Sequence, residues 1–208
     1  MKGSLIVVGF FILGLIVGHT DCMPAWVMGN DTSFIALCIL LFFVGLGIGM
    51  NPDMKKDIKS LSPRLALLPL ATILGSWLGA VVAYLIMNID LTSVLQHRSL
   101  NDCLALNSGF AYYSLSSIFI TEYRGAELGT IALLANIIRE MITLLLTPLL
   151  AKWFGPLAPI STGGATTMDT TLPIITQTIG LRYVALSIYH GFVTDFSVPF
   201  LVTMWCVL

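Results

Sequence analysis

The segment Ser161–Pro173 reads STGGATTMDTTLP. Our prediction of the fold starts from this segment. It combines two adjacent glycines, a carboxylate and several threonines, yet the 208-residue chain around it is 57% hydrophobic and only 10% charged. Soluble domains are about 25% charged, so the composition indicates an integral membrane protein. Polar, unwound backbone is tolerated at membrane depth only where protein buries it or water fills a cavity. Transporters place substrate sites at such interruptions, so the segment predicts a transport site.

The apolar runs around this segment predict a single all-α domain over residues 1–208, folded as a polytopic bundle of membrane helices. Continuous helices are expected over residues 4–19, 33–50, 65–87, 128–150 and 182–207. Two other segments, 100–121 and 156–180, are too polar for lipid-facing spans and are expected to be discontinuous or re-entrant. The first apolar run is short enough for a signal peptide, but it lacks a small-residue cleavage pattern, which favours a transmembrane helix.

The densest basic loop lies between the second and third expected helices, at residues 51–64. It holds Lys55, Lys56, Lys59 and Arg64. Cytoplasmic loops of membrane proteins carry an excess of Lys and Arg. This loop and the N-terminus are therefore predicted to be cytoplasmic, with the acidic loop at residues 20–32 on the outside.

The chain offers no pattern for metal or cofactor chemistry. Its four cysteines are far apart and lack metal-ligand spacing, so mostly inert core thiols are expected at Cys22, Cys38, Cys103 and Cys206. An intramembrane enzyme is a competing hypothesis, but the sequence contains neither a metal-binding histidine pair nor a Ser/His catalytic arrangement. We therefore expect no enzymatic activity, no metal and no cofactor. The net charge of −1 gives no indication of nucleic-acid binding.

A weak internal repeat pairs the two polar segments at an offset of 55 residues. Each polar segment contains glycine and precedes an apolar helix that carries an acid. Paired interrupted segments in two halves of a chain indicate a transporter site. The repeat is inverted or parallel, depending on whether each polar segment crosses the membrane. The register pairs Gly109 with Gly164, Ser114 with Asp169, Thr121 with Thr176, Gly125 with Gly180, and Glu140 with Asp195.

One face of the expected helix 128–150 is polar. Its side chains recur at helical spacing, with Arg139 adjacent, in the order Asn136, Glu140, Thr143 and Thr147. A charge at the centre of a membrane helix costs roughly 2.5–3.5 kcal/mol, so a polar cavity or partners are expected. In one interpretation Glu140 binds a cation or proton while Arg139 tunes it or contacts a carboxylate. In the other, the charges form a structural ion pair between helices.

The later interruption supplies a candidate cation site. Two glycines, Gly163 and Gly164, permit the backbone to unwind, and the carboxylate of Asp169 follows them. The hydroxyl groups of five threonines are further candidate ligands, namely Thr162, Thr166, Thr167, Thr170 and Thr171. The alternative is a polar extramembrane loop with a turn and a helix cap, which the apolar flanks disfavour.

The earlier interruption lies at Asn107, Ser108 and Gly109. A half-helix that begins there would direct its amide groups at an anion, with Tyr112 and Ser114 as candidate lining residues. The alternative is close helix packing through small residues.

A second polar stripe runs along the last helix. It contains Tyr183, Ser187, His190, Thr194 and Ser197. His190 either relays protons or is a hydrogen-bonded packing residue. Asp195 lies off this stripe, and its role stays open.

Four motifs in this order resemble a known family. They are NSGFAYYSLSS at residues 107–117, the pair Arg139–Glu140, GGATTMDTTLP at 163–173, and HGF at 190–192. Together they are similar to the LysO-type lysine exporter family of bacteria, over essentially the whole chain. The resemblance implies a multi-pass protein of the bacterial cytoplasmic membrane that exports L-lysine and analogues such as thialysine. It also implies that inward movement of a cation, proton or sodium, drives export.

The resemblance has two departures. The full-length form of the family carries additional N-terminal helices, so we expect either a small separate membrane subunit or a homo-oligomer to cover the polar faces. Some relatives also have an acid near the position of Asn136, which leaves the coupling stoichiometry open. Lysine itself fits the residues: Glu140 and Asp169 would face its ammonium groups or the driving cation. Half-helix N-termini near Gly109 and Gly164 would take its carboxylate.

Two further hypotheses remain beside lysine export. One is a cation-coupled carrier of another small cationic or organic solute. The other is an assembly subunit that transports nothing, which has little need of buried charges and is disfavoured for that reason.

Overall fold

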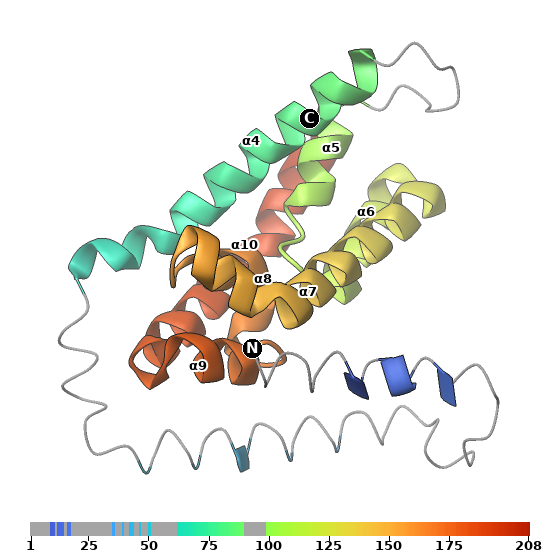
Figure 1. Ribbon diagram of the computed structural model, residues 1–208. Helices are drawn as coiled ribbons and strands as arrows, with labels where there is room; N and C mark the ends of the chain where they lie inside the picture. Colours follow the sequence, from blue (N-terminus) through green and yellow to red (C-terminus); the bar gives the residue numbers. More distant parts are fainter. Residues whose placement is uncertain are drawn as a thin grey trace.

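The computed structural model describes residues 62–89 and 99–208, together with scattered positions between 9 and 50. Every regular element in residues 62–89 and 99–208 is helical (Figure 1). The expected helices 4–19 and 33–50, Cys22, Cys38 and most of the basic loop lie outside the described residues. The all-α membrane bundle predicted from the sequence is confirmed.

Within the described residues, three helices are long and apolar enough to cross a bilayer. Their apolar stretches are Pro63–Met87, Ala126–Phe154 and Leu181–Val207. The first consists of the 3₁₀ turn η1 (Pro63–Leu67) and α4 (Leu68–Ile89), and the second is α7 (Ala126–Phe154). The third joins the 3₁₀ turn η3 (Leu181–Tyr183) to α10 (Val184–Val207).

The first polar segment is a broken helix. It consists of α5 (Leu100–Asn107) and α6 (Tyr113–Arg124). A capping box fixes the start of α5, because Ser99 accepts from the Asp102 amide and Asp102 accepts from the Ser99 amide. At 1.5 Å per residue, neither half could cross a hydrocarbon core of about 30 Å alone. Between them Phe110 and Ala111 have positive φ angles of 43° and 69°.

The second polar segment is broken in the same manner. It contains α8 (Ala158–Gly163), the 3₁₀ turn η2 (Gly164–Met168) and α9 (Leu172–Ile179). Gly164 begins the interruption with a φ of +59°. The prediction of two discontinuous polar segments is therefore confirmed.

The repeat detected at an offset of 55 residues also has a structural counterpart. Gly125 joins α6 to α7 with φ 92° and ψ 166°, while Gly180 joins α9 to η3 with φ 96° and ψ 158°. Each glycine amide closes the preceding half-helix at 3.0 Å, on Thr121 O and Thr176 O respectively. These are the residues that the register pairs. Each half of the repeat thus runs as half-helix, break, half-helix, glycine and long helix.

The last helix, α10, is the centre of the bundle. It packs against α4, α5, α6 and η2, and Figure 1 shows α4, α5 and α10 side by side. Gly191 permits the contact with η2, since a Cβ there would lie 2.7 Å from the Met168 amide nitrogen. The main apolar cluster joins α10 to the first broken segment and α7. It contains Ala105, Phe110, Ile120, Leu128, Ala132, Val198, Val202 and Cys206.

Candidate functional site

The two helix breaks meet at the centre of the bundle. The Ala165 amide of the second break donates to the Phe110 carbonyl of the first at 2.9 Å. The approach is so close that a Cβ on Gly164 would lie 2.3 Å from the Phe110 oxygen. Glycine is thus required at position 164 both by its positive φ and by this contact. Two unwound segments in contact are the arrangement in which transporters build a midplane site.

Asn136 holds the first break in place from α7. Its Oδ1 accepts from the Ala111 amide at 2.8 Å, and its Nδ2 donates to Ala132 O at 2.9 Å. The side chain is only 3% exposed, and a Cβ at Gly109 would lie 2.4 Å from Nδ2. Asn136 therefore positions the break, and its hydrogen-bonding groups are occupied by protein.

The threonines of the second break hydrogen-bond within the protein. Thr166 donates to Gly163 O at 2.9 Å, and Thr171 donates to Thr166 O at 2.9 Å. Thr167 lies 2.8 Å from Gly164 O and 2.9 Å from Ser187 O on α10. Thr166 and Thr167 therefore stabilise the unwound backbone rather than face a cavity.

An acidic pair joins this break to α7. Thr170 donates its hydroxyl hydrogen to Glu140 Oε1 at 2.5 Å, and its amide donates to Asp169 Oδ1 at 2.5 Å. One threonine therefore bridges both carboxylates, which are half-buried and interact electrostatically. Asp169 also interacts with Asp195 of α10 and with Tyr112 at the start of α6. Asp169 thus lies within electrostatic range of two other acids, Glu140 of α7 and Asp195 of α10.

A cavity of about 590 Å³ opens beside this pair. Thr170 lines it together with residues of α7, α9 and η3, namely Leu144, Pro173, Ile174, Thr176, Gln177 and Leu181. Its volume lies in the range of small-molecule sites. A small cationic solute in this cavity would reach Thr170, the residue that hydrogen-bonds to both carboxylates.

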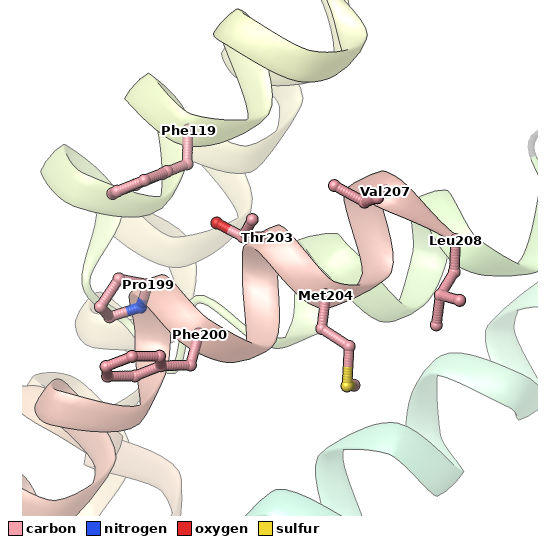
Figure 2. A pocket seen from close by; sticks show the side chains of 7 residues that line it. All are labelled: Phe119, Pro199, Phe200, Thr203, Met204, Val207 and Leu208. Carbon is pink, nitrogen blue, oxygen red and sulfur yellow. The ribbon is translucent and has the colours of Figure 1, made fainter.

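Another cavity, of about 640 Å³, has a different character (Figure 2). It lies between α6 and α10, and Thr203 is the polar residue of its lining. The other residues are Phe119, Pro199, Phe200, Met204, Val207 and Leu208. Because it presents no charged group, we do not assign the transport site to it.

Arg139 faces a different partner from its neighbour Glu140. Its Nε donates to Thr162 O at 2.9 Å and its Nη2 to Ser161 O at 3.1 Å. These carbonyls lie at the C-terminal end of α8, where a cation is favoured by the helix dipole. The guanidinium also lies 5.6 Å from the Phe110 ring centroid. Within residues 62–89 and 99–208 it makes no ion pair, so the predicted structural ion pair is not formed there.

His190 is fully buried and links three elements. Its Nε2 lies 2.9 Å from Thr72 Oγ1 of α4, and its Nδ1 lies 3.4 Å from Thr167 Oγ1 of η2. Both ring nitrogens therefore have protein partners. This geometry favours the interpretation of His190 as a hydrogen-bonded packing residue.

The candidates around the first break have mixed environments. Asn107 donates to Cys103 O at 3.0 Å, within its own helix. Ser108 is fully buried, accepts from Trp77 Nε1 at 2.9 Å and donates to Leu104 O at 2.7 Å. Ser114 is exposed, and Tyr112 is half-buried. Of these residues, Tyr112 is the one that reaches the acids.

Among the described residues, no group of three or more His, Cys, Asp or Glu side chains has the geometry to hold a metal ion. Cys103 and Cys206 are buried, and neither forms a disulfide within the described residues.

Comparison with known proteins places this sequence in a family. The sequence profile described as "Lysine exporter LysO" matches residues 8–206. The chain belongs to the LysO lysine exporter family. Lysine exporter LysO of Escherichia coli strain K12 is 31% identical over 97% of this chain, and the match spans 64% of that protein's length. A Haemophilus influenzae protein named "Putative lysine exporter" is 30% identical over 93% of both chains. No solved structure matches the chain.

Within this LysO-family chain, sequence reasoning and geometry select overlapping residues. The structure brings Glu140 and Asp169 together but directs Arg139, Asn136 and His190 at protein partners. Thr170, a candidate hydroxyl ligand from the sequence, hydrogen-bonds to both acids. Asp195 was left without a role by the sequence analysis, although the repeat register places it opposite Glu140.

Proposed function

We propose that this chain exports L-lysine and lysine analogues across the bacterial cytoplasmic membrane, as an antiporter driven by inward movement of a proton or sodium ion. Membership of the LysO lysine exporter family supports the substrate. The observation that carries the proposal is the pairing of Glu140 and Asp169 through Thr170 at an interruption of the bundle. Carboxylates at membrane depth are costly and mark cation or proton pathways.

The mechanism follows from this placement. A lysine ammonium group and the driving cation would compete for the same carboxylates, so occupancy by one requires release of the other. Such competition couples the two fluxes without a second site. The crossing of the two breaks, where Ala165 bonds Phe110, is a place at which one half of the repeat can rock against the other.

The decisive experiment is Glu140→Gln, which removes the charge but keeps the shape. We expect cells expressing it to lose resistance to thialysine and to stop exporting lysine, while the protein still accumulates in the membrane. The matched control is Glu122→Gln, at an exposed position of α6, which should export normally. Full thialysine resistance in Glu140→Gln would contradict the proposal.

The second candidate is a carrier of another small cationic or organic solute. The same acidic pair would serve any compact cation, and the adjacent cavity is lined by both apolar and polar residues. Uptake by inside-out vesicles containing the purified chain, measured for lysine, arginine, ornithine and neutral amino acids, separates the two. Partners are part of the same proposal: a small membrane subunit or a second copy would complete the bundle, and cross-linking in the membrane would identify which.

A further inference from the structure

We propose that the cavity beside Arg139 is a carboxylate subsite that takes the α-carboxylate of the transported amino acid. The cavity has a volume of about 340 Å³ and lies between α4, α7 and α8. It is lined by Ala71, Thr72, Gly75, Ser76, Arg139, Ser161 and Thr162. This assignment rests on the proposed function, because it names the part of the site that recognises the anionic end of the substrate.

The polar groups of this cavity are mainly donors. A guanidinium has five N–H donors, and Arg139 uses three of them on Thr162 O, Ser161 O and Ser76 Oγ. Two N–H groups are left over. The hydroxyl hydrogens of Ser76 and Ser161 have no hydrogen-bond partner within the described part of the chain. The carbonyls of Ser161 and Thr162 already accept from Arg139, so the groups left for a ligand favour an anion.

The charge of Arg139 also favours an anionic ligand. Arg139 makes no ion pair with any carboxylate in residues 62–89 and 99–208, and its compensation there comes from the C-terminal carbonyls of α8. A buried charge without an opposite charge is unfavourable. A carboxylate entering the cavity would supply that charge. The planar fork of a guanidinium matches the two oxygens of a carboxylate.

The depth of Arg139 in the membrane limits which anions can reach the cavity. Arg139 lies near the middle of the 29-residue α7. At 1.5 Å per residue it is about 20 Å from either end of the helix. A hydrocarbon core is about 30 Å thick, so a lipid phosphate at the headgroup level lies outside the reach of this cavity. A lipid headgroup is therefore excluded, and the carboxylate of the transported solute is the anion that we assign to this cavity.

The start of α9, which follows the second break, could also attract a carboxylate, but its amide groups are already occupied. The Thr170 amide donates to Asp169 Oδ1, the Thr171 amide to Thr166 O, and the Leu172 amide to Asp169 O. An anion there would also meet the carboxylate of Asp169. Arg139 and Glu140 are consecutive residues of α7 and point about 100° apart around an ideal helix. The anionic and cationic ends of one amino acid would thus be recognised on neighbouring faces of α7.

The test fills the cavity without touching Arg139, since substitution of Arg139 would uncap α8. A Cβ at Gly75 meets no atom within 4 Å, and Gly75 lines the cavity, so Gly75→Leu adds side-chain volume at the cavity wall. The matched control is Gly79→Leu. Gly79 lies one turn further along α4, is equally open and does not line the cavity.

Binding of radiolabelled lysine to the purified full chain is measured in competition with unlabelled lysine, lysinamide and cadaverine. Lysinamide and cadaverine lack the carboxylate but keep the ammonium groups. On the wild type and Gly79→Leu we expect both analogues to compete at least roughly ten-fold more weakly than lysine, the size of one charged hydrogen bond. Gly75→Leu should bind lysine at least ten-fold more weakly. It should also no longer distinguish lysine from lysinamide and cadaverine.

Three results would count against the inference. If lysinamide competes as well as lysine on the wild type, the carboxylate is not recognised, and this inference fails while lysine transport stands. If lysine binding is lost when chloride is replaced by gluconate, the cavity holds an inorganic anion instead. If the wild type neither binds nor transports lysine, the proposed function itself fails, and this inference fails with it.

Discussion

Thr170 donates its hydroxyl hydrogen to Glu140 across 2.5 Å and its amide hydrogen to Asp169, so one residue links the acid of a continuous helix to the acid of a broken one. α7 is a continuous helix, whereas residues 164–171 interrupt the second broken segment. Any displacement of that segment relative to α7 must break or rebuild this link. The geometry therefore connects the occupancy of the acidic pair to the position of the break.

Removing that hydroxyl tests the connection directly. In Thr170→Val the side chain keeps its shape but leaves Glu140 without its donor. A hydrogen bond to a charged group contributes about 1.5–3 kcal/mol, so we expect the lysine concentration for half-maximal transport to rise at least roughly ten-fold. Thr170→Ser keeps the hydroxyl and should behave like the wild type. Equal transport by the valine and serine variants would show that the bridge has no role.

The contact between the two breaks gives a prediction for stability. Gly164→Ala places a Cβ 2.3 Å from Phe110 O at a φ of +59°, whereas Gly180→Ala adds a Cβ at a φ of +96° with no atom within 4 Å. Backbone strain of about 1–3 kcal/mol applies to both variants, but only the first also separates the two breaks. Thermal unfolding of the purified protein in detergent should show a larger drop in Tm for Gly164→Ala. Equal drops in Tm would mean that backbone strain alone requires glycine at position 164, and that the contact between the two breaks does not.

Much of this arrangement could be predicted from the sequence because the membrane penalises polar backbone. Two glycine-bearing polar segments in an apolar chain predicted both breaks, and the offset of 55 residues paired Gly125 with Gly180 before their matching conformations were known. The pattern also placed Asn136, Thr143 and Thr147 on a single buried stripe.

The partners of the charged residues could not be predicted in the same way. Adjacent residues on a helix point to different neighbours, so the pair Arg139–Glu140 gave no sign that one caps α8 while the other meets Thr170. Phe110 and Ala111 adopt positive φ angles without being glycine, and the contacts with Ala165 and Asn136 help to hold them there. Tertiary contacts determine both the partners of the charged residues and these positive φ angles. The local sequence does not indicate such contacts.

Asn136 provides a further prediction. In Asn136→Ala the Ala111 amide loses its acceptor, and Ala111 is fully buried, so no water replaces it. An unsatisfied buried group costs about 1–3 kcal/mol, and we expect a clear loss of Tm together with reduced accumulation in the membrane. Asn107→Ala is the matched control, because Asn107 is half-buried and only donates to Cys103 O within α5. A Tm loss in Asn107→Ala as large as in Asn136→Ala would contradict the role of Asn136 as the support of the first break.

Asp195 is the acid that the repeat register pairs with Glu140, and both interact electrostatically with Asp169. If the cation site spans both halves of the repeat, Asp195→Asn should lower lysine transport several-fold without loss of protein from the membrane. Residues that act on one shared group are coupled, so the double variant with Glu140→Gln should lose less than the two single effects combined. Ser197→Ala, two residues away on α10 and bonded only to Thr194 O, is the control and should transport normally. Normal transport by Asp195→Asn would confine the cation site to Glu140 and Asp169, and the symmetry of the repeat would then describe the fold and not the function.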